Sequence, residues 1–99
     1  MNTPGVTNVL WLMRRAPGFF DQVCYTGTGS ATTIPHNLVV APQLYIVKNR
    51  SASGWDWIVG STLLSNTGAL FLDSSLSVDN TYTTAWNSTY PTSTNLSVG

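Results

Sequence analysis

The clearest pattern of apolar and polar positions lies at residues 42–60, PQLYIVKNRSASGWDWIVG. Its first part contains four consecutive apolar residues, LYIV, which is typical of a strand covered on both faces. In its last part, Trp55, Trp57 and Val59 fall on one face, because successive side chains of a strand point to opposite sides. The Ser- and Gly-rich segment 49–54 separates the two parts and permits a reversal. The pattern predicts a β-hairpin around which the rest of the chain packs.

Further short runs of β-branched, aromatic and apolar residues recur along the chain. They occupy residues 9–14, 19–26, 31–35, 69–72, 82–86 and 96–98. Together with the hairpin they predict about seven or eight short strands, with turn signals about every 8–12 residues. We therefore predict an all-β fold, an antiparallel β-sandwich that is jelly-roll-like. Residues 14–99 are predicted to form this domain, and residues 1–13 an N-terminal arm that can also serve as an edge strand.

Composition supports an all-β protein that works inside an assembly. Charged residues make up 8% of the 99 residues, against about 25% in a typical domain. The formal net charge is zero, so nothing steers the chain towards nucleic acid or anionic lipid. A surface with so few charges is weakly protected against association. No apolar run approaches the roughly 18 residues needed to span a bilayer.

The residues that usually carry chemistry form no recognisable constellation. The chain has four Asp and no Glu, and no spacing brings two carboxylates together as a glycosidase requires. Asp73 and Asp79 could offer oxygen ligands to calcium, but hydrogen bonds within their loop are the simpler interpretation. His36 lacks the partners of a base or a metal ligand, and Cys24 is expected to be a small buried thiol in a strand. We predict no enzyme activity, catalytic residue, metal or cofactor.

The tryptophans are the more informative set. They are Trp11, Trp55, Trp57 and Trp86. Their alternate spacing on strands favours packing in a core or an interface, whereas exposed rings could stack on sugars. Arg14 and Arg15 are expected to be solvated ends of the 9–14 element, with acid or phosphate binding as the alternative. Trp11, Trp55, Trp57, Arg14 and Arg15 are therefore the candidate contacts to a partner chain or a glycan.

A series of short motifs extends over residues 14–99. It comprises RAPGFFD (15–21), VCYTG (23–27), Gly29, PHNL (35–38), Ala41-Pro42, IVKNR (46–50), Trp55, Trp57, WNST (86–89), PTS (91–93) and LSVG (96–99). In this order the motifs resemble a β-rich domain of virion proteins of marine tailed bacteriophages. The resemblance implies a structural role in large tail or appendage proteins of the particle, with no catalytic residues to carry over.

The chain departs from that resemblance in two places. Such domains usually have glycine after the leucine of the His-x-Leu stretch, where this chain has Val39, so the turn is expected to differ. They also continue beyond the equivalent of Gly99 into one more hydrophobic strand. A sandwich without that strand would leave an open edge. We expect a neighbouring chain or the arm at residues 1–13 to cover it.

These features together predict a bacteriophage virion structural protein, a tail or appendage component. It would bind other virion chains, and further copies of itself as a homo-oligomer, through strand edges and aromatic or apolar patches. Capsid decoration, a cement role, is the first alternative. A module that binds host surface glycans through exposed tryptophans is the second.

Overall fold

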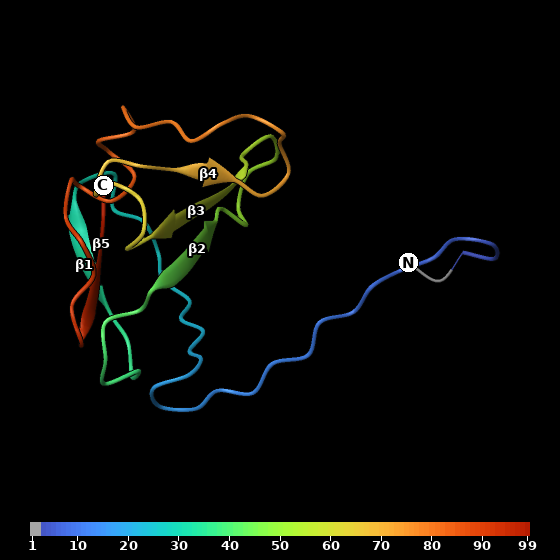
Figure 1. Ribbon diagram of the computed structural model, residues 1–99, viewed down its shortest axis with the longest axis horizontal. Helices are drawn as coiled ribbons and strands as arrows, with labels where there is room; N and C mark the ends of the chain where they lie inside the picture. Colours follow the sequence, from blue (N-terminus) through green and yellow to red (C-terminus); the bar gives the residue numbers. More distant parts are fainter. Residues whose placement is uncertain (1–2) are drawn as a thin grey trace.

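The computed structural model describes residues 3–99, and within them the chain is all-β with no helix. Five short strands follow one another along the chain (Figure 1): β1 (Thr32–Pro35), β2 (Leu44–Lys48), β3 (Trp57–Ser61), β4 (Leu70–Phe71) and β5 (Asn95–Val98). They form two antiparallel sheets, one with the order β1-β5 and one with the order β2-β3-β4.

The predicted hairpin is confirmed as β2 and β3. The two strands pair over five positions, from Leu44 opposite Ser61 to Lys48 opposite Trp57. Isoleucine, valine and aromatic side chains dominate both strands and suit the pleated, half-buried surface of a sheet. β4 extends this sheet by pairing Phe71 with Ile58.

The second sheet joins segments that are far apart in the sequence. β1 pairs with β5 over four positions, from Thr32 opposite Val98 to Pro35 opposite Asn95. The pairing continues where the amide of His36 donates to the carbonyl of Thr94 at 2.9 Å. In Figure 1 the two strands lie side by side, next to the three-stranded sheet.

A small core forms on one face of the β2-β3-β4 sheet. Trp86 is 1% exposed, and its ring meets Tyr45 edge to face at a centroid distance of 4.7 Å. Its indole N–H donates to the carbonyl of Gly68 at 3.0 Å. Tyr45 pairs with Gly60 across the sheet, and a Cβ at Gly60 would lie 2.8 Å from Cε2 of Trp86. Glycine at this position therefore makes room for both rings.

Three of the predicted strands are absent, so the described residues hold five strands and not seven or eight. The run at 9–14 extends into solvent, where no strand is available to pair with it. The run at 19–26 is extended but has only one isolated bridge, between Ala16 and Phe20. The run at 82–86 is turn-rich and is followed by Asn87 and Ser88, both with a φ of 49°. A left-handed backbone of this kind ends an extended segment.

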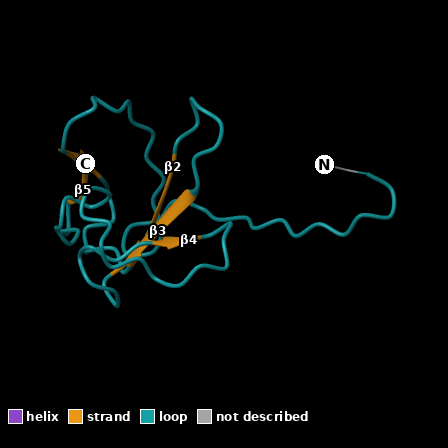
Figure 2. Ribbon diagram, turned by 90° about the horizontal axis from the view of Figure 1, so that it is seen from above, coloured by secondary structure: helices purple, strands orange, loops and turns teal. Residues whose placement is uncertain are grey.

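The amino-terminal segment projects away from the body in two perpendicular views (Figures 1 and 2). We call residues 6–13 the arm; residues 1–2 of the predicted arm lie outside the described residues. The Cα radius of gyration is 14.8 Å, against about 13 Å for a compact domain of 100 residues.

Candidate interaction surface

The described residues expose far more apolar side chains than they bury. Nineteen large apolar residues among positions 3–99 are exposed, and only five hydrophobic residues are buried. The chain has an accessible surface of 7514 Å² at 10.7 kDa, about 2,000 Å² above the roughly 5,500 Å² expected of a globular monomer of this mass. Single exposed apolar residues are ordinary, but a contiguous set marks an interaction site.

Many of these side chains line one large open groove. Its volume is about 1850 Å³, and its walls include β2 and the extended segment 18–27. Eight of the exposed apolar side chains belong to it: Met13, Phe19, Val23, Tyr25, Val40, Leu44, Ile46 and Trp57. Pockets for small molecules usually measure about 300–1,000 Å³, so the size of this groove suits a segment of polypeptide better.

Cys24 also lines this groove, and the prediction of a buried thiol is wrong. The side chain is exposed. Within residues 3–99 the expected strand 19–26 has no partner strand, and Cys24 therefore stays on an open wall of the groove. A segment that binds in the groove would therefore reduce the accessibility of this thiol to a labelling reagent.

Trp55 and Trp57 are both about half exposed, at 54% and 45%. Lys48 lies beside them, with its Nζ 6.0 Å from the centroid of the Trp57 ring. The same ammonium group donates a hydrogen bond to the carbonyl of Trp55. The lysine tip therefore fixes the end of the hairpin and leaves parts of both indole rings open to a partner.

Trp11 lies on the arm and is 76% exposed. Its neighbours in residues 9–13 are exposed by 55–85%. The segment has no strand pairing. The structure thus places Trp11 apart from Trp55 and Trp57, and the three rings do not form one platform within a single chain.

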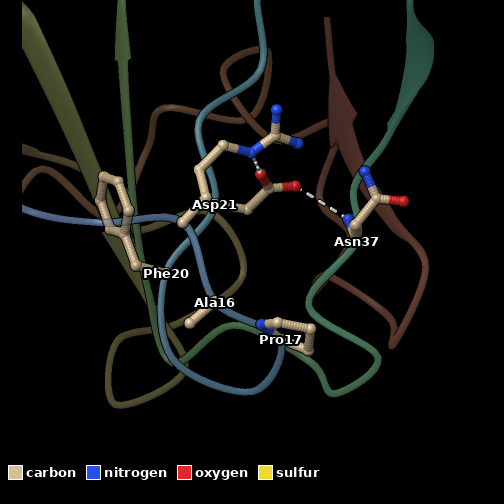
Figure 3. Close-up of a pocket in the computed structure, with 6 residues that line it drawn as sticks. Ala16, Pro17, Phe20, Asp21 and Asn37 are labelled. Carbon is tan, nitrogen blue, oxygen red and sulfur yellow. Dashed lines mark hydrogen bonds and ion pairs between the residues drawn. The ribbon is translucent and has the colours of Figure 1, made fainter.

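The arm is attached to the body through a network around Asp21 (Figure 3). Arg15 Nε lies 2.6 Å from the Asp21 carboxylate, whose side chain is 5% exposed. The same carboxylate accepts hydrogen bonds from the backbone N–H groups of Asn37 at 2.8 Å and Gln22 at 2.9 Å. The hydrogen bond from Asn37 makes the largest contribution to lowering the pKa of Asp21 below its ordinary value, and the contacts with Arg15 and Gln22 act in the same direction. Arg15 is therefore engaged within the chain.

A shallow cavity of about 100 Å³ adjoins this network. Its walls are Arg15, Ala16, Pro17, Phe20, Asp21 and Asn37. Arg14 is exposed, and among residues 3–99 the ion pair to Asp21 is made by Arg15. The predicted arginine pair is therefore divided, because Arg15 binds Asp21 and Arg14 faces solvent. In the sequence, the only indication of this contact is that the acidic residue nearest to the arginines, Asp21, lies six positions after Arg15.

His36 has a structural environment. Its Nδ1 accepts from the amide of Leu38 at 3.3 Å, and its Nε2 lies 3.2 Å from the carbonyl of Thr92. Both ring nitrogens are thus committed to backbone groups. Among residues 3–99, no group of three or more His, Cys, Asp or Glu side chains could hold a metal ion. The same residues include no helix able to cross a membrane.

Comparisons with known proteins give a family. Searches among curated proteins and among solved structures gave no significant match. One family model, described as a domain of unknown function, DUF7483, matches residues 2–99. A match over nearly the whole chain defines membership, and the protein therefore belongs to the DUF7483 family.

Proposed function

We propose that this chain is a structural protein of a bacteriophage particle, a tail or appendage component that acts by binding other chains of the particle. The observation that carries this proposal is the excess of exposed apolar surface over buried core. Burial of apolar surface stabilises association by about 25 cal/mol per Å², so a surface of this kind favours a bound state. The motif series at residues 15–99 adds support through its resemblance to phage virion domains.

In the assembled particle, the two sheets form the layers of a β-sandwich of the jelly-roll type. The single chain has the β1-β5 and β2-β3-β4 sheets, and its extended segment 19–26 has almost no strand partner. A neighbouring chain that adds a strand beside β2 supplies hydrogen bonds to this edge and covers the apolar groove. The sandwich is thus completed between chains.

Mass spectrometry of purified particles tests the proposal. The chain is expected in stoichiometric amounts with the known virion proteins, whereas a replication protein of the same phage serves as the negative control. Separation of tails from heads then decides the placement: the chain in the tail fraction supports the tail or appendage role, and the chain on heads supports the cement alternative. Abundance in the infected cell with absence from particles would contradict both.

A second candidate function is glycan recognition at the host surface. The half-exposed rings of Trp55 and Trp57 favour it, because an open aromatic face is an apolar platform for a sugar ring. In that case Trp55→Ala and Trp57→Ala abolish binding on a glycan array while the far-UV spectrum is retained. Trp11→Ala, on the separate arm, serves as the matched control and should leave sugar binding intact. Equal loss in all three variants would count against a glycan site.

A further inference from the structure

The outer edge of β2 is open. Within residues 3–99, β2 pairs with β3 and no other strand lies on its far side. An edge strand presents unpaired N–H and C=O groups, which are a template for another strand. The groove runs along this edge, and its walls include Leu44 and Ile46, exposed by 62% and 45%. The site therefore offers both backbone hydrogen bonds and apolar contact to an extended segment.

The arm has the properties that this site requires. Residues 9–13, VLWLM, match the five-residue length of β2. No charged residue occurs from Thr3 to Met13, so insertion of the arm into an apolar groove buries no charge. In an extended conformation its side chains alternate, with Leu10 and Leu12 on one side and Trp11 on the other. The arm is thus an unpaired strand with two apolar faces.

The base of the arm directs it away from its own groove. The ion pair between Arg15 and Asp21 and the backbone pairing of Ala16 with Phe20 hold the chain immediately after the arm. The arm leaves this fixed point outward (Figures 1 and 2). Met13 itself lines the groove, so each arm starts at the rim of a groove. Two copies facing each other across this rim can exchange arms over a short distance.

The areas agree with such an exchange. A stable interface buries about 800 Å² per partner. The accessible surface of 7514 Å² exceeds that of a globular monomer of this mass by about 2,000 Å². Trp11 can bury about 150–250 Å², and each of the four aliphatic or Met side chains of residues 9–13 about 60–120 Å². One docked arm thus buries about 400–700 Å². In a reciprocal exchange each chain buries its own arm and the groove that receives the partner's arm, so the area per chain reaches the size of a stable interface.

We infer that the groove beside β2 binds the arm, residues 6–13, of a second copy of this chain, and that the two copies exchange arms reciprocally. The inserted arm adds a strand to the free edge of β2 and places its apolar side chains against Leu44 and Ile46. This inference rests on the proposed function and deepens it by naming the partner and its contact. Reciprocal exchange makes the contact isologous, as in most homodimers.

Cross-linking between differently tagged copies tests the exchange. In a Cys24→Ser background, Leu12→Cys is introduced in one copy and Ile46→Cys in the other, and the mixture is treated with a short bismaleimide. A cross-linked heterodimer is expected. Leu76→Cys replaces Ile46→Cys in the control, since Leu76 is 69% exposed and does not line the groove. A double variant, Leu12→Cys with Ile46→Cys in one chain, is treated in parallel. Equal cross-linking to Leu76→Cys, or cross-linking of the double variant only within single chains with no heterodimer in the mixture, would overturn the inference.

The mass in solution provides a second readout. The double variant Leu10→Ser, Leu12→Ser should raise the dissociation constant at least a hundredfold, because it removes two apolar side chains that the complex buries. The matched control, Leu63→Ser with Leu76→Ser, changes two leucines that are also largely exposed, by 93% and 69%, but lie outside arm and groove. It should leave the constant unchanged. A monomeric parent chain would overturn the inference. Detection of that chain in purified particles would still support the proposed function, so the two failures are distinguishable.

Discussion

Replacement of Val39 by glycine should stabilise the protein. Val39 has a φ of 61° and is 68% exposed. A β-branched residue in this left-handed region is strained, whereas glycine adopts it freely. The conformation is held in place next to Leu38, whose carbonyl accepts a hydrogen bond from the amide of Gly18 at 2.7 Å. The exposed valine side chain adds little packing that its removal would lose.

The expected size follows from two opposed effects. Relief of the left-handed conformation is worth about 1–2 kcal/mol. The greater freedom of glycine in the unfolded chain offsets about 0.5–1 kcal/mol of this. The net gain in the free energy of unfolding of Val39→Gly should be about 0.5–1 kcal/mol, which raises Tm by about 2–8 °C in a domain of this size.

Val40→Gly is the matched control, because the same chemical change is made at a neighbour without a positive φ. It should destabilise by at least about 0.5–1 kcal/mol, because the unfolded-state effect acts without relief of strain and the half-exposed side chain at the groove is also lost. Urea unfolding followed by far-UV circular dichroism, at one fixed protein concentration, measures both variants. If Val39→Gly destabilises the protein as much as Val40→Gly does, residue 39 is not strained and the reasoning is refuted.

Three further predictions concern the core and the base of the arm. Trp86→Phe should lower the free energy of unfolding by about 2–4 kcal/mol, because it opens space beside Tyr45 and deprives a buried carbonyl of its donor; urea unfolding checks this, and a loss no larger than that of Trp55→Phe would contradict it. Gly60→Ala should destabilise by about 1–3 kcal/mol through overpacking against the two rings, measured in the same way, and an unchanged midpoint would contradict it. The pKa of Asp21 is lower in the folded state than in the unfolded state. As the pH falls, the Asp21 carboxylate is therefore protonated in the unfolded chain before it is protonated in the folded one. The parent should therefore be more stable than Asp21→Asn above about pH 4, with the difference lost as the pH falls through the native pKa of this group; a difference that persists in acid would contradict it.

The local pattern of the sequence was sufficient for β2 and β3. Their apolar runs and the polar link between them specify a hairpin, in which pairing depends only on nearby residues. Composition also locates β1 and β5, but their pairing joins residues sixty or more positions apart. Such contacts depend on the path of the whole chain and leave no local signal.

The missing strands and the groove could not be read from the same pattern. Residues 19–26 have the composition of a strand, but a strand also needs a partner, and this segment has almost none within the described residues. Trp86 was expected on a strand, yet it reaches the core from a turn because Gly60 leaves room for its ring. The sequence indicates the exposed tryptophans as contacts, whereas the role of Asp21 in fixing the arm depends on the fold, which brings its carboxylate to Arg15 and to the amide of Asn37.

Sedimentation equilibrium of the unaltered chain at micromolar concentrations tests the central claim, association through exposed apolar surface, most directly. We predict the mass of two chains or more, with dissociation on dilution. We also expect the tryptophan emission of the chain to shift to shorter wavelength as the complex forms, because Trp11 leaves solvent, and this shift should be lost in Trp11→Phe. A folded species that keeps the mass of one chain, 10.7 kDa, at all concentrations would contradict the account.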